Sequence, residues 1–186
     1  YLWEDYICGT LAHEFQHMVH WYRDKNEESW LSEGFSMLAG LINDLDPGGF
    51  DYSYIANPDL QLTDWGSNVG QNGPHYGAAF LFTTYLYDRF GEEATKAVVA
   101  HEENGMESID IVLSEMDITD LQTGQKALAE EIFADWAVAN LLGDSEVADG
   151  RYAYSVYPTA PRANPGTTYA SCPIGPGAGG RQGPPP

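Results

Sequence analysis

Basic side chains are scarce in this chain. Its 186 residues include 8 lysines and arginines against 28 aspartates and glutamates, for a formal net charge of -20. Binding to nucleic acid needs a basic surface, so this composition argues against a nucleic-acid partner. An acidic balance of this size suits a protein that its own charge keeps soluble, as in secreted proteins. Most of the acidic surface is expected to be solvated, without a specific partner.

Long hydrophobic runs are absent. No stretch of about 18 consecutive apolar residues occurs, so the sequence predicts no membrane-spanning helix. The chain also has no internal repeat, glycine-rich phosphate loop or Ser/His/Asp triad that would indicate another class of site. Its hydrophobic content of 43% is sufficient for one ordinary core. We predict one domain over residues 1–157, followed by a flexible, proline- and glycine-rich tail over residues 158–186.

Cysteine is rare, with only Cys8 and Cys172. A disulfide between them would close a long loop and stabilise the fold by about 4 to 5 kcal/mol in the chain-entropy model. The alternative is two unpaired thiols, with Cys8 buried as a small apolar side chain. The sequence leaves both possibilities open.

An H-E-x-x-H pattern occupies residues 13–17, within a segment predicted to be helical over residues 6–23. On such a helix His13 and His17 lie about 40° apart, so both imidazoles can reach one zinc ion at about 2.0 to 2.1 Å. Glu14 lies beside the metal, where a general base can take a proton from water. The alternative is two helical histidines hydrogen-bonded in a core. An apolar stripe facing away from the histidines is expected to pack into the protein: Leu11, Phe15, Met18 and Tyr22.

A third metal ligand is predicted on a second amphipathic helix, over residues 30–45. Glu33 lies on the face opposite the apolar stripe of that helix, and a polar loop over residues 24–29 allows the helix to fold back on the first. The rival ligand is His20, which shares a face with His13 and His17. Three histidines over two turns of one helix would have to span about 10 Å, so we favour Glu33. His20 is then expected to contact the metal ligands without binding the ion, to lie in the cleft, or to be exposed.

The pattern at 13–17, followed by Trp-Leu-Ser-Glu-Gly at 30–34, resembles the gluzincins, the zincin metallopeptidases with a glutamate third ligand. The Glu-Gly-Phe-Ser sequence at 33–36 looks most like hyicolysin-like and immune-inhibitor-A-like secreted bacterial proteases. The thermolysin branch has an aspartate that orients the first histidine one turn after the glutamate. Met37 stands at that position here, so the residue that orients His13 is unidentified.

The resemblance implies a fold and a function. The chain is expected to be mainly α, the helical C-terminal half of a zincin-like α+β metallopeptidase, with a β-rich subdomain upstream of Tyr1 that pairs with extended substrates. The implied activity is zinc-dependent hydrolysis of peptide bonds in polypeptide substrates outside the cell. His13, His17 and Glu33 would bind zinc, and Glu14 would be the general base. The alternative is a catalytically inactive zinc-binding or adhesion module derived from such an enzyme.

His75 and Tyr76 precede an apolar helix predicted over residues 77–90. A tyrosine or histidine donor stabilises the developing oxyanion in several gluzincins, and we prefer Tyr76 to His75 for this part. The alternative is equally open: His75 begins the helix and Tyr76 packs.

The rest of the chain is predicted to be helical and irregular. Further helices are expected over residues 92–100, 108–116 and 125–142, and one strand over residues 150–157. Residues 50–74 are expected to form a long connection that walls the cleft, with a short extended piece near residues 60–62. Asp44, Asp46 and Asp51 could hold Ca²⁺, although an ordinary turn is the favoured interpretation.

Overall fold

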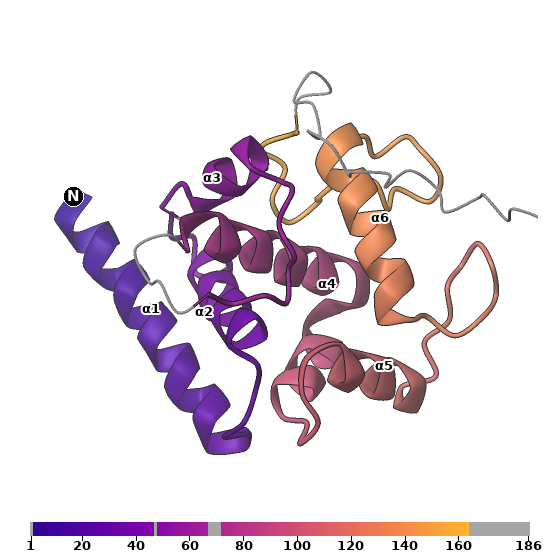
Figure 1. Ribbon diagram of the computed structural model, residues 1–186, viewed down its shortest axis with the longest axis horizontal. Coiled ribbons are helices and arrows are strands. Elements are labelled where there is room, and N and C mark those ends of the chain that lie inside the picture. Colours follow the sequence, from indigo (N-terminus) through magenta and orange to yellow (C-terminus); the bar gives the residue numbers. More distant parts are fainter. Residues whose placement is uncertain (1, 47, 67–71, 164–186) are drawn as a thin grey trace, which may run out of the picture.

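The computed structural model describes residues 2–46, 48–66 and 72–163, and among them it contains six helices and no strand (Figure 1). This confirms the prediction of a mainly helical protein. None of the described helices is both long and apolar enough to cross a membrane. The helices are α1 (Leu2–Arg23), α2 (Ser29–Ile42), α3 (Phe50–Ala56), α4 (Gly73–Val99), α5 (Gly105–Glu115) and α6 (Ala129–Leu142).

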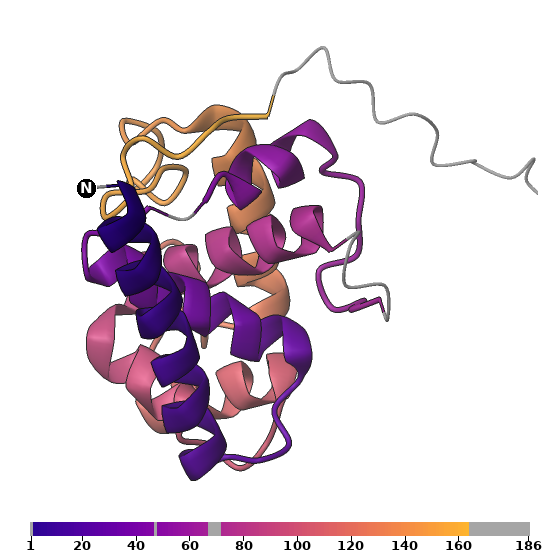
Figure 2. The same ribbon diagram turned by 90° about the vertical axis from the view of Figure 1, so that its left-hand side faces the viewer.

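The first half of α4 is the centre of the core. Phe80, Leu81 and Phe82 are fully buried, and helices α2 and α3 make their main contacts with α4. Helix α1 runs along one edge of the molecule against α2, and its outer side faces the viewer in Figure 2. The α1–α2 pair therefore forms one side of the molecule.

Two glycines allow close approach to α4. A Cβ atom on Gly34 of α2 would lie 2.7 Å from the Ala79 carbonyl oxygen, and one on Gly77 of α4 would lie 2.0 Å from the Phe50 carbonyl oxygen. Real Cβ atoms essentially never come this close to other heavy atoms, so these backbones can meet only at glycine. Gly34 follows Glu33 and Gly77 follows Tyr76, so both packing points adjoin residues that the sequence singles out.

Helix α4 is broken at Gly91, which has a φ of 79° and a ψ of -177°. The predicted end of one helix at residue 90 and start of another at residue 92 agree with this break. Helix α6 begins at Ala129, later than predicted. The residues before it form a loop that an antiparallel bridge between Thr119 and Lys126 closes.

The prediction of a long connection over residues 50–74 was wrong in its first part. Residues 50–56 form α3, which begins after Gly49 in a left-handed conformation and packs on α4 at Gly77. No extended strand occurs near residues 60–62; Leu62 instead is buried within a turn. A short helix with one packing face is hard to recognise in an aromatic-rich polar segment.

The strand predicted over residues 150–157 is also wrong, because these residues form turns and bends. Alternating aromatic residues make a strand only where a partner strand supplies the ladder. Here side-chain hydrogen bonds hold the segment: the Tyr154 hydroxyl donates to Asn140 Oδ1 at 2.7 Å, and the Tyr157 hydroxyl donates to Asp51 Oδ2 at 2.8 Å.

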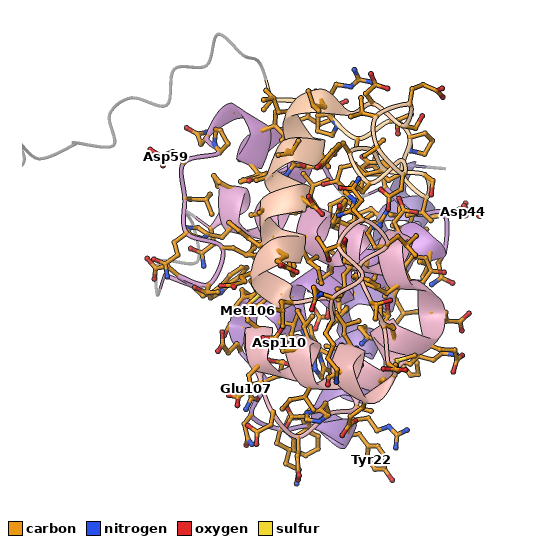
Figure 3. All side chains as sticks on the ribbon, turned by 90° about the vertical axis from the view of Figure 1, so that its right-hand side faces the viewer. Tyr22, Asp44, Asp59, Met106, Glu107 and Asp110 are labelled. Atoms are coloured by element: carbon orange, nitrogen blue, oxygen red, sulfur yellow. The ribbon has the colours of Figure 1, made fainter. Side chains whose placement is uncertain are left out.

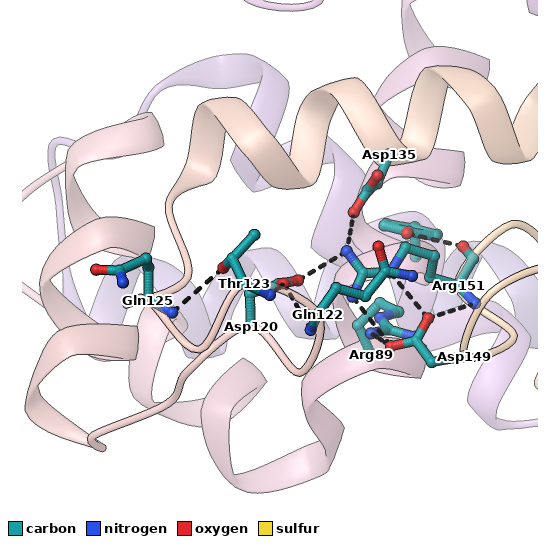
Figure 4. Close-up of polar contacts among 9 residues, drawn as sticks. Arg89, Asp120, Gln122, Thr123, Gln125, Asp135, Asp149 and Arg151 are labelled. Carbon is teal, nitrogen blue, oxygen red and sulfur yellow. Dashed lines mark hydrogen bonds and ion pairs between the residues drawn. The ribbon is translucent and has the colours of Figure 1, made fainter.

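Arg151 anchors this irregular segment (Figure 4). Its guanidinium donates to both oxygens of Asp149 at 2.8 and 3.0 Å, and its Nη1 lies 2.7 Å from Asp120 and from Asp135. Its carbonyl oxygen accepts a hydrogen bond of 2.8 Å from the buried Tyr85 hydroxyl. One buried cation therefore joins α4, α6 and two loops.

Candidate metal centre

His13, His17 and Glu33 converge between α1 and α2. The two Nε2 atoms of the histidines lie 3.1 Å apart, and Glu33 Oε2 lies 3.1 Å from His13 Nε2 and 3.3 Å from His17 Nε2. The histidines share a face because they are one turn apart on α1, and the connection after Arg23 folds α2 back so that Glu33 faces them. The structure thus brings together the three residues predicted as ligands.

The donor set fits a zinc ion. Ligand atoms about 2.0 Å from a tetrahedral ion lie about 3.3 Å from one another, close to the three distances between these atoms. Two imidazole nitrogens 3.1 Å apart would direct lone pairs at each other unless a proton or a cation lies between them. The three side chains are only about one-fifth to one-quarter exposed, so the site is partly shielded but open on one side.

Glu33, rather than His20, is the third member of this group. Burial by itself would raise the pKa of Glu33, but its contacts with His13 and His17 lower that pKa to about 2. Glu33 is therefore ionised at neutral pH and offers a negative charge to a cation. The contact with Glu33 raises the pKa of His17, burial acts in the opposite direction, and the charge of Glu14 adds to the rise.

Ser32 is a residue of this site that sequence reasoning missed. Its Oγ lies 3.2 Å from His17 Nδ1, so a proton on Nδ1 can be donated to Ser32 while Nε2 faces the centre. The only sign of this role in the sequence is that Ser32 directly precedes the predicted ligand Glu33.

Met37, which stands where the thermolysin branch has an aspartate, is half-buried against the core.

Glu14 and Tyr76 lie at the edge of the centre. Glu14 is exposed on α1 and lies near enough for its charge to raise the pKa values of His17 and Tyr76. Burial is the main cause that raises the pKa of Tyr76, followed by the charge of Glu33. The Tyr76 phenol therefore keeps its proton at neutral pH and can act as a hydrogen-bond donor.

His75 has different surroundings from Tyr76. Both lie within the first turn of α4, and Trp65 packs edge-on against both rings, at centroid distances of 6.0 Å to His75 and 5.0 Å to Tyr76. No contact between His75 and the three converging residues is found in the described part of the chain. Trp65 thus helps to position Tyr76 beside Glu33.

The predicted packing stripe of α1 faces solvent instead. Leu11, Phe15, Met18 and Tyr22 are 61% to 80% exposed, and Tyr22 projects away from the helices (Figure 3). The reason is that α1 packs on α2 through the histidine face, so the opposite face turns outward. A shallow hollow of about 790 Å³ on this outer surface borders Glu14 and His17. Its other lining residues are Phe15, Met18, Val19, Trp21, Tyr22 and Arg23.

The carboxylates considered for Ca²⁺ do not form a group. Asp44 is exposed at the periphery (Figure 3), and Asp46 Oδ1 accepts the Gly48 amide at 2.8 Å. Asp51 is buried on α3 and accepts from Tyr157. Among the described residues, the three do not converge as ligands of one ion.

Cys8 is exposed on α1, so the alternative in which it is buried as a small apolar side chain was wrong on that point. Cys172 lies outside the described residues, and the predicted disulfide alternative stays a prediction.

A scan against protein-family models and searches of curated proteins and solved structures found no match to this chain.

Proposed function

We propose that this chain carries the catalytic centre of a zinc-dependent peptidase of the gluzincin type. The observation that carries the proposal is the triangle of His13 Nε2, His17 Nε2 and Glu33 Oε2, with sides of 3.1 to 3.3 Å. These three side chains would hold the ion. When bound, zinc would supply a Lewis acid that polarises a carbonyl group and makes water more acidic.

The residues beside the triangle have the properties that peptide hydrolysis requires. Glu14 is exposed and is not one of the three converging ligands, so its carboxylate is available to accept a proton from water and pass it to the leaving amine. Tyr76 keeps its phenolic proton because burial and Glu33 raise its pKa, so it can donate a hydrogen bond to a carbonyl oxygen that gains negative charge. His75 is the second candidate for this donor.

The substrate class follows from the surroundings of the site. The hollow next to Glu14 and His17 is lined mainly by aromatic and aliphatic side chains, which suit the side chains of a polypeptide. We propose endopeptidase activity on proteins outside the cell; the acidic composition and the resemblance to secreted proteases support that location.

Two measurements test the proposal. Elemental analysis should show that Glu33→Ala holds about one zinc ion fewer per chain than wild type. Glu14→Gln should keep the wild-type zinc content and lose proteolysis of a casein substrate, assayed with any region that precedes this chain in the natural protein. Glu4→Gln, at an exposed glutamate on the same helix, is the matched control and should keep activity.

Each outcome separates the proposal from its rivals. Equal zinc in wild type and Glu33→Ala would contradict the ligand assignment. Full activity in Glu14→Gln would remove its role as general base. Zinc binding without proteolysis in wild type would favour the alternative, an inactive zinc-binding or adhesion module.

A further inference from the structure

A second group of potential ligands lies at the other end of the α1–α2 connection. His20 of the last turn of α1 and Asp24 and Glu27 of the connection each place one ligand atom within 4.8 Å of the others. His20 is 1% exposed, Asp24 is 8% exposed, and the Glu27 side chain is 3% exposed. The alternative in which His20 is exposed was therefore wrong.

Four polar atoms of this group have no hydrogen-bond partner among the described residues. They are both ring nitrogens of His20, Asp24 Oδ2 and Glu27 Oε2, and all four are buried. Leaving one such group unpaired costs about 1 to 3 kcal/mol, and more for a charged group, so several in one place need an explanation. A hydrogen bond between His20 and Glu27 does not supply it, because His20 Nε2 lies 3.7 Å from Glu27 Oε2.

The carboxylates are held in place by their other oxygens. Asp24 Oδ1 accepts the Asn26 amide at 3.2 Å, and Glu27 Oε1 accepts the amides of Glu28 at 2.6 Å and Gly105 at 2.8 Å. Each carboxylate thus has one oxygen fixed by backbone N–H groups and one without a hydrogen bond in the described part of the chain. This arrangement orients ligands before an ion arrives.

The charge of the group calls for a cation. In the described part of the chain no lysine or arginine forms an ion pair with Asp24 or Glu27. The C-terminal end of α1, at Arg23, adds the negative end of the helix dipole at the same place. A protonated His20 would bring one positive charge against two carboxylates, whereas a divalent cation would balance both.

We propose that His20, Asp24 and Glu27 form a second site for a divalent transition-metal ion, distinct from the centre at His13, His17 and Glu33. One imidazole and two carboxylates suit zinc, whereas Ca²⁺ takes six or more oxygen ligands. Two ligands of one tetrahedral zinc ion, each about 2.0 to 2.2 Å from it, lie about 3.3 to 3.6 Å apart. The 3.7 Å between His20 Nε2 and Glu27 Oε2 is close to this range. The ion joins the end of α1 to the start of α5.

Metal content with zinc as the probe tests this site. After dialysis against buffered zinc, wild type should hold about two ions per chain and His13→Ala/His17→Ala about one. Adding His20→Gln to that double variant should remove the remaining ion. Adding His101→Gln, at a histidine after α4, should leave it in place. Circular dichroism confirms that each variant keeps its helices.

Two conservative variants decide the case if His20→Gln fails to fold. Asp24→Asn and Glu27→Gln keep the side-chain volume, and each should weaken zinc binding of the double variant at least about 10-fold. Undiminished binding in both would overturn the proposal, as would a double variant that folds and binds no zinc. The inference does not depend on hydrolysis: a wild-type ion lost with His20→Gln but kept in His13→Ala/His17→Ala would support it even if the proposed peptidase centre failed.

Discussion

Gly34 lies so close to Thr83 that a Cβ atom on Gly34 would come within 2.7 Å of the Thr83 Cγ2 atom. Thr83 is itself fixed, because its hydroxyl donates to the Ala79 and Phe80 carbonyl oxygens of α4. The contact sets the distance between α2 and α4, and Glu33 precedes Gly34 in α2. The position of the third candidate ligand therefore depends on a glycine that has no part in metal binding.

Replacing this glycine should damage both stability and zinc binding. Gly34→Ala should lower the free energy of unfolding by about 1 to 3 kcal/mol, because the new methyl group meets backbone and a fixed side chain. Gly40→Ala is the matched control: a Cβ there meets nothing within 4 Å, so the change should stabilise the helix by about 0.5 to 1 kcal/mol. Urea unfolding measures the free energy of unfolding of both variants. Equal stability of Gly34→Ala and Gly40→Ala would contradict the packing argument.

Ser32 should influence zinc affinity without being a ligand. Ser32→Ala removes the oxygen that lies 3.2 Å from His17 Nδ1, so the imidazole is no longer held in one tautomer and orientation. We expect the zinc dissociation constant of the first centre to rise by about 10-fold, measured by competition with a chelator. Ser36→Ala, at a buried serine on the same helix whose hydroxyl has no hydrogen-bond partner among the described residues, should leave the affinity unchanged.

Tyr76 should act on turnover and not on metal content. Tyr76→Phe removes the phenolic donor beside Glu33 and keeps the ring that packs on Trp65. We expect kcat for peptide hydrolysis to fall by about 10- to 1,000-fold with the zinc content unchanged. Tyr52→Phe changes an exposed tyrosine on α3 and serves as the control. An unaltered rate in Tyr76→Phe would favour the packing interpretation and direct attention to His75.

Arg151 should contribute far more to stability than an exposed cation. Arg151→Met leaves Asp120, Asp135 and Asp149 without the cation that they share (Figure 4). We expect the free energy of unfolding to fall by about 2 to 3 kcal/mol. This is less than the loss for a fully buried ion pair, because the three carboxylates are partly exposed. Lys96→Met breaks only exposed contacts with Glu92 and Glu93 and should have little effect. Thermal and urea unfolding of both variants make the comparison.

The same cluster should make stability depend on pH. Hydrogen bonds from Arg151 hold the pKa of Asp149 below its usual range, against the effect of burial. Because the folded-state pKa is the lower one, the stabilisation is fully present above the unfolded value of about 3.9 and is lost as the pH falls through the folded value. The stability difference between wild type and Asp149→Asn should therefore be constant between about pH 7 and pH 5 and shrink below about pH 4.

Urea unfolding at several pH values measures this difference. Asp59→Asn, at an exposed aspartate on the periphery (Figure 3), should show no such dependence. A difference for Asp149→Asn that grows as the pH falls would contradict the assignment.

Much of the candidate centre was already determined by local sequence. The spacing of His13 and His17 places them on one face of any α-helix, and a glycine at position 91 ends a helix because it adopts a positive φ. The residues that share a helix face follow from periodicity alone. The helical class of the protein followed for the same reason.

Tertiary structure alone decided which faces are covered. Periodicity predicted burial of the stripe from Leu11 to Tyr22, yet α1 packs through its histidine face because Glu33 and the buried group around His20 lie on that side. The approach of Glu33 to the histidines depends on the contact of Gly34 with α4, and the loop at Arg151 depends on carboxylates distant in sequence. These are long-range contacts, whose energies no local pattern contains.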